Sequence, residues 1–107
     1  MATGGTAPKR AYRCITVNIT PGNPPTVDLD PVYVSKNRKD EVVWDCPGDP
    51  NFEVIFETGS PFTKDRFSNG KNRSGPAKAT AKEKPYEYKY TVKAGGGTAD
   101  PSTIVDA

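Results

Sequence analysis

Apolar residues occur along the chain in short blocks, and most blocks alternate with polar residues. Between Arg13 and Thr20, the side chains of Ile15, Val17 and Ile19 are separated by polar positions. A period of two residues is typical of a β-strand that buries one face. We therefore predict a first strand over 13–20.

Similar blocks recur about every ten residues, a spacing typical of all-β proteins. Further strands are expected over 27–35 (interrupted by Pro31), 41–45, 52–56, 77–81, 86–91 and 102–105. The segments 63–76 and 93–101 are expected to be loops, the first anchored only by Phe67. About seven strands with turns between them predict a mostly antiparallel β-sandwich. Trp44 and Phe56 lie in phase with apolar neighbours and are expected in its core.

The length and the turn-forming residues limit the architecture. The chain has 107 residues, with ten glycines and eleven prolines, which argues against long helices and for one domain. Residues 1–10 are expected to be a flexible N-terminal arm and 11–107 a single domain. No apolar run approaches the length of a membrane span, and the first residues lack the apolar core of a signal peptide. The protein is therefore either cytoplasmic or exported with its signal removed.

Charge and the missing histidine exclude several functions. Fifteen basic and thirteen acidic residues give a net charge of +2, without the concentrated basic surface typical of nucleic-acid binders. Nothing in the sequence points to a membrane partner. Because the chain has no histidine, it lacks the usual general base, the imidazole metal ligand and any Ser-His or Cys-His pair. We expect no enzyme activity and no cofactor.

Two stretches carry a family resemblance. Residues 27–56 contain a strand kinked at Pro31, a polar turn, the motif V-x-W and then the strand FEVIF; residues 86–105 contain an alternating aromatic strand, a glycine-rich loop and a last strand. Together they cover about half of the chain and resemble the cupredoxins. This resemblance implies a Greek-key β-sandwich.

The resemblance does not extend to the copper ligands. The positions that match the two histidines, the cysteine and the methionine hold Phe52, Lys93, Tyr90 and Thr98, in that order. A blue-copper site needs two imidazoles and a thiolate close together. We therefore expect a cupredoxin-like domain that binds no copper.

The resemblance also bears on the two cysteines, Cys14 and Cys46. In the cupredoxin arrangement the first strand and the Trp44 strand lie side by side and run in the same direction. The Cα atoms of Cys14 and Cys46 would then be about 13–16 Å apart, which is too far for a disulfide bridge. We expect two thiols, with Cys14 the more buried.

Several candidate sites have simpler explanations. Asp28 and Asp30, with Asp45 and Asp49, lack the close spacing around glycine that calcium loops use. Glu53 and Glu57 fit the solvent face of a strand. Lys93 beside 95–97 could bind an anion, but no helix follows it, and a turn is the simpler interpretation. A set of aromatic residues could form a pocket at the former copper end or simply fill the core: Trp44, Phe52, Tyr86, Tyr88 and Tyr90.

One basic segment is the only candidate surface for a negatively charged partner. It comprises Lys64, Arg66, Phe67, Lys71 and Arg73. The simpler interpretation is a solvated loop.

These observations favour a non-enzymatic interaction or accessory module, a monomer whose partner is an unidentified protein or anionic ligand. Its contact surfaces would be the loops 47–51, 63–76 and 93–101, because rigid sandwiches present function on loops. The alternative is an electron-transfer or metal-handling protein that uses Cys14, Cys46 and carboxylates at another site. An enzyme with a histidine-free mechanism is a third, remote alternative.

Overall fold

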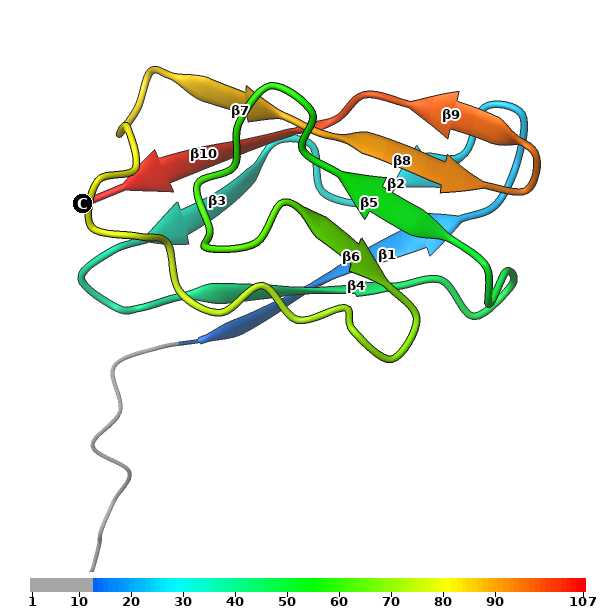
Figure 1. Cartoon of the computed structure of the whole chain (residues 1–107), viewed down its shortest axis with the longest axis horizontal. Helices are drawn as coiled ribbons and strands as arrows, with labels where there is room; N and C mark the ends of the chain where they lie inside the picture. Colours follow the sequence, from blue (N-terminus) through cyan, green and yellow to red (C-terminus); the bar gives the residue numbers. More distant parts are fainter. Residues whose placement is uncertain (1–12) are drawn as a thin grey trace, which may run out of the picture.

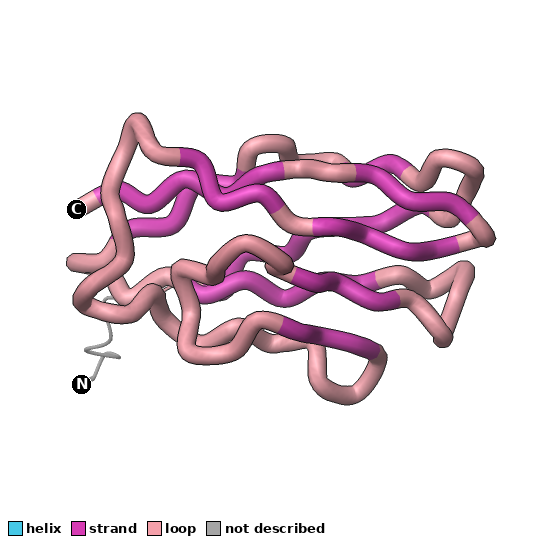
Figure 2. The backbone as a smooth tube through the Cα atoms, turned by 45° about the horizontal axis from the view of Figure 1, so that its top comes forward, coloured by secondary structure: helices cyan, strands magenta, loops and turns pink. Residues whose placement is uncertain are grey.

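The computed structural model describes residues 13–107, which form three β-sheets and no helix (Figures 1 and 2). The expected arm over 1–10 lies outside this part of the chain. None of the described residues belongs to a helix that could cross a membrane. The all-β prediction is confirmed, although the strands are shorter and more numerous than predicted: β1 (Cys14–Thr20), β2 (Thr26–Val27), β3 (Val32–Ser35), β4 (Glu41–Asp45), β5 (Glu53–Ile55), β6 (Arg66–Ser68), β7 (Glu87–Lys89), β8 (Thr91–Ala94), β9 (Gly97–Ala99) and β10 (Ser102–Asp106).

The first sheet has the order β2-β1-β4. Strand β1 pairs with β2 in antiparallel and with β4 in parallel orientation, with Val17 opposite Trp44. Val17 and Ile19 are buried while the polar residues between and beside them are exposed, as the alternation predicts. The parallel neighbours expected from the cupredoxin resemblance are therefore present.

The other two sheets have the orders β3-β10-β7 and β6-β5-β8-β9. Strand β10 runs parallel to β3 and antiparallel to β7, whereas every pairing in the last sheet is antiparallel. All three sheets contribute to one hydrophobic core. Trp44 and Phe56 are buried in it, as predicted.

The tyrosine-rich segment differs from the single strand predicted over 86–91. Strand β7 pairs with β10, while β8 pairs with β5 and β9, so the chain passes from one sheet to another at Tyr90. The Tyr90 amide donates to the carbonyl of Pro101 at 2.9 Å, where the returning chain makes the same passage between β9 and β10. The continuous alternation hides this change of sheet, because side chains keep their period of two across it.

Three further predictions are wrong. The segment 63–76 contains β6, which pairs with β5, and the segment 93–101 contains β9. Gly95 and Gly96 have φ angles of 69° and 88°, which lets a two-residue turn join β8 to β9. The segment 77–81 is a turn rather than a strand, in which the Ala81 amide donates to the carbonyl of Lys78 at 3.0 Å.

Candidate functional site

The four positions matched to copper ligands do not surround one point. Phe52 and Tyr90 are buried, whereas Lys93 and Thr98 are exposed and lie opposite each other on β8 and β9. Tyr90 is two residues before the buried Val92 and lies on the same face, whereas Lys93 is the next residue after Val92 and lies on the opposite face of the sheet.

The register of β5 and β8 identifies a different neighbour for Phe52. Glu53 lies opposite Lys93, which places Phe52 across from Ala94 at the next position of the ladder. Both residues are buried, and neither side chain carries a ligand atom. The residue opposite Phe52 is thus Ala94, whose side chain is a methyl group. Tyr90 lies four residues before Ala94 in the chain.

Tyr90 belongs to a cluster of five rings in the centre of the core. The ring centroids of Trp44 and Tyr90 are 5.6 Å apart, those of Phe56 and Tyr90 5.0 Å, and those of Trp44 and Phe67 4.7 Å. Phe62 completes the cluster. These side chains fill the core, and no aromatic pocket forms from the predicted set.

The remaining members of that predicted set lie apart from the cluster. Tyr86 and Tyr88 pair edge to face, with centroids 4.7 Å apart. Tyr86 is exposed, and the hydroxyl of Tyr88 accepts a hydrogen bond from the Lys82 amide at 2.7 Å.

Two polar groups in the ring cluster lack a well-formed hydrogen bond within residues 13–107. They are the indole N–H of Trp44 and the hydroxyl of Tyr90. Burial raises the pKa of Tyr90 to about 12, and the nearby indole N–H of Trp44 offsets part of this effect. A phenol that stays protonated in a closed core offers neither a metal ligand nor a reactive base.

The loop 47–51 and the turn between β8 and β9 meet at one end of the sheet. The carboxylate of Asp49 accepts hydrogen bonds from the amides of Gly95 and Asn51, both at 2.9 Å, and these bonds lower its pKa. A side chain at Gly95 would collide with the backbone of Gly22, whose amide donates to the carbonyl of Ala94 at 3.2 Å. This end is therefore fixed by close backbone packing.

A hollow of about 420 Å³ lies beside these loops. Its polar lining includes Asp49, Asn51, Glu53, Lys93 and Thr98. The arrangement can donate and accept hydrogen bonds, but its mixed charges select no particular ligand. The candidate calcium residues Asp28 and Asp30 serve other contacts, with the backbone amides of Asn18 and Ser102.

The predicted basic contact segment is only partly a surface. Phe67 is buried, because β6 pairs with β5 and turns this side chain into the core. Arg73 forms an ion pair with Glu41 at 2.6 Å. Lys64, Arg66 and Lys71 remain exposed. Phe67 is therefore removed from the candidate contact residues.

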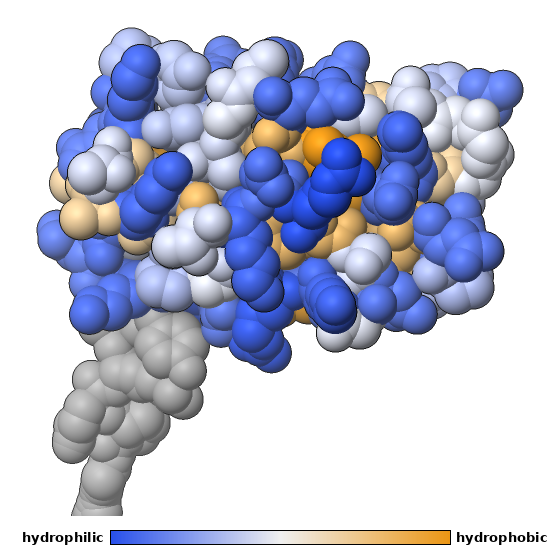
Figure 3. Space-filling model, in the orientation of Figure 1, coloured by the Kyte–Doolittle hydropathy of each residue, from blue (hydrophilic) through white to orange (hydrophobic). Residues whose placement is uncertain are grey.

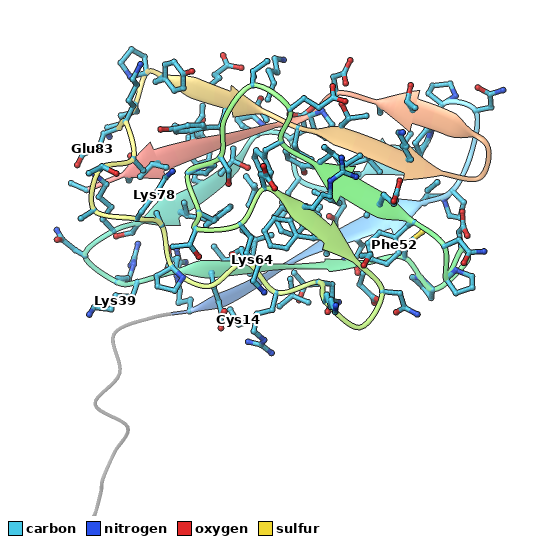
Figure 4. All side chains as sticks on the ribbon, in the orientation of Figure 1. Cys14, Lys39, Phe52, Lys64, Lys78 and Glu83 are labelled. Atoms are coloured by element: carbon cyan, nitrogen blue, oxygen red, sulfur yellow. The ribbon has the colours of Figure 1, made fainter. Side chains whose placement is uncertain are left out.

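The cysteines are both free thiols, as predicted, but their burial is reversed. Cys14 is exposed, with its Sγ 3.7 Å from the Arg73 guanidinium, and Cys46 is buried (Figure 4 labels Cys14). In the register Cys14 lies opposite Glu41, five residues before Cys46, which is about 16 Å along the strands. Burial raises the pKa of the Cys46 thiol.

A second group of cations was missed from the sequence. It is divided between the turn after β3 and the segment that precedes β7, and each segment alone carries three of the six cations. The pairing of β10 with both β3 and β7 brings the two together, and a cavity lies between them.

Comparisons of this chain with known protein families, curated proteins and solved structures gave no match. Its function is therefore argued from its own residues.

Proposed function

We propose that this chain is a copper-free cupredoxin-like Greek-key β-sandwich and acts as a non-enzymatic interaction or accessory module. The parallel pairing of β1 with β4 and of β10 with β3 supports the cupredoxin-like order. So does the break between β2 and β3 around Pro31.

One observation carries the copper-free part of the proposal. Phe52, where the upstream histidine is expected, is buried across from Ala94, and Tyr90 is packed among core rings. A chain without histidine cannot supply the imidazoles of a blue-copper site at this end. The fixed loop 47–51 and the turn between β8 and β9 then remain as a rigid, polar surface suited to contact with a partner.

The alternative, a metal or electron-transfer site that uses both cysteines, is not favoured by their placement. A shared metal would require the two sulfurs within about 4 Å of each other. Cys14 and Cys46 lie near opposite ends of paired parallel strands.

Copper titration of the purified protein tests this proposal. We expect no stoichiometric copper after dialysis and no intense visible band from a thiolate. The variants Cys14→Ser and Cys46→Ala serve as controls for adventitious binding to thiols. Tight copper with such a band in the wild type would refute the copper-free proposal, and its loss in either variant would support the metal-handling alternative.

A further inference from the structure

Cations gather at the end of the molecule where β3 and β10 finish. Lys36 connects the two segments that form this end, because its Nζ donates to the carbonyl of Ala79 at 3.0 Å and pairs with Glu83 at 3.3 Å. Figure 4 shows Lys39, Lys78 and Glu83 at this end. Six basic side chains lie on the two segments: Lys36, Arg38, Lys39, Lys78, Lys82 and Lys84.

Most of these cations have no acidic partner. Lys36 pairs with Glu83, and Lys84 pairs with Asp106 at 3.1 Å. Between residues 13 and 107, no carboxylate lies within ion-pair distance of the other four, Arg38, Lys39, Lys78 and Lys82. Unpaired like charges at one end create a field that attracts an anionic partner.

A cavity of about 480 Å³ lies between the two basic segments. This size is within the range of ligand-binding pockets. Figure 3 shows weakly apolar residues among hydrophilic ones at this end. The cavity, called here the lysine cavity, is lined by three charged residues and three residues without polar side chains: Lys36, Lys39, Glu83, Pro76, Ala77 and Ala79.

Lys39 occupies a backbone conformation that favours glycine. Its φ is 56°, in the left-handed region. The buried carboxylate of Asp40 holds the turn in place, accepting a hydrogen bond from the Ser35 amide at 3.0 Å. A lysine kept at a strained position on the rim of a cavity suggests that its side chain has a use there.

We propose that the lysine cavity binds an acidic polypeptide segment. Carboxylates of the partner pair with Lys39, which lines the cavity, and with the exposed Lys78, which lies between the lining residues Ala77 and Ala79, and an apolar side chain of the partner covers the alanines. The ion pair between Lys36 and Glu83 is an example of this contact within the chain itself. This inference rests on the proposed interaction function and adds the class of partner.

The observations favour a polypeptide over a nucleic acid or a membrane. Glu83 and Asp106 interrupt the row of lysines, and Pro76, Ala77 and Ala79 line the cavity beside them, so this end lacks the continuous basic surface that binds a phosphate backbone. A segment with a few carboxylates and an apolar side chain matches this mixture of cations and apolar groups.

Fluorescence anisotropy with a labelled peptide of glutamates around a single leucine tests the proposal. We expect saturable binding that weakens with salt. Lys39→Gly and Lys78→Gln should each weaken it roughly twofold to fivefold. Lys71→Gln, an equal loss of charge on the 63–76 segment, should leave it unchanged. Lys39→Gly should unfold at the same urea concentration as the wild type or a higher one, so that its weaker binding cannot be due to unfolding.

Three results would overturn the proposal. They are the absence of saturable binding by the wild type, an equal or larger loss in Lys71→Gln, and tighter binding of an oligothymidylate or of phosphatidylserine vesicles than of the peptide. A loss confined to Lys71→Gln would place the contact on the 63–76 segment and leave the interaction function standing. The copper titration tests the copper-free part of the proposed function separately.

Discussion

Replacing Tyr90 by phenylalanine should stabilise the protein, although it removes a polar group from the core. Tyr90 is 1% exposed, and its hydroxyl has no well-formed hydrogen bond among the described residues. A buried polar group without a partner costs about 1–3 kcal/mol. Removing one oxygen leaves a small void, which costs about 0.3 kcal/mol of stability. We expect a gain of about 0.7–2.7 kcal/mol at neutral pH.

The gain should grow in alkali. The pKa of Tyr90 is raised to about 12 in the folded protein, mainly by burial, against an ordinary value near 10. Between these values the unfolded chain loses the phenol proton while the folded protein keeps it. Below pH 10 both states keep the proton, and ionisation does not affect stability; as the pH rises from 10 toward 12, ionisation of the unfolded chain alone lowers the stability of the wild type. The wild type should lose up to about 2.7 kcal/mol that Tyr90→Phe does not lose.

Urea unfolding measures this difference, because Trp44 is the only tryptophan and is buried. Because Trp44 lies beside Tyr90, the substitution can itself change the fluorescence of Trp44, and circular dichroism therefore serves as a second probe of unfolding. Tyr88→Phe is the matched control. Its hydroxyl accepts the Lys82 amide at 2.7 Å, so the same chemical change should cost about 0.5–1.5 kcal/mol.

The reasoning is refuted if Tyr90→Phe destabilises the protein by more than about 1 kcal/mol at pH 7. That result would mean that the hydroxyl has a good partner in the core. A stability difference between variant and wild type that stays constant from pH 7 to pH 11 would contradict the raised pKa.

Three further predictions follow from burial and charge. Phe56→Ala should cost about 3–5 kcal/mol in urea unfolding, because its ring contacts four other buried rings; a loss under about 1 kcal/mol would contradict this packing. Alkylation without reductant should modify Cys14 in the native protein and Cys46 only after unfolding, as mass spectrometry would show; no modification after unfolding would reveal a bridge. Burial alone would raise the pKa of Asp40, but hydrogen bonds, chiefly from the side chain of Arg13, lower it. Asp40→Asn should cost about 1.5–3 kcal/mol at pH 7, and the difference should shrink as the pH falls below about 4; a difference independent of pH would refute this.

Local alternation predicted much of the secondary structure. The strand expected over 41–45 has the same bounds as β4, and the first and last predicted strands differ from β1 and β10 by one residue. The break around Pro31 and the core positions of Trp44 and Phe56 were also predicted. These features depend on neighbours along the chain, where the period of two separates buried from exposed side chains.

The candidate site was less predictable. Phe67 stands in a polar run and was assigned to a surface, yet pairing of β6 with β5 buries it. Cys14 alternates like an ordinary strand residue, and its exposure depends on what covers that face of β1. Both outcomes are decided by segments distant in the sequence.

The sequence by itself determined the all-β class, the positions of most strands and the lack of any histidine for copper or catalysis. Only the tertiary structure decided which sheet each strand joins, that the tyrosine-rich segment changes sheets at Tyr90, and that Lys39 and Lys78 share one end of the molecule. The physical reason is that alternation records which face of a strand is buried, whereas sheet membership and charge clustering arise from hydrogen bonds and packing between distant segments.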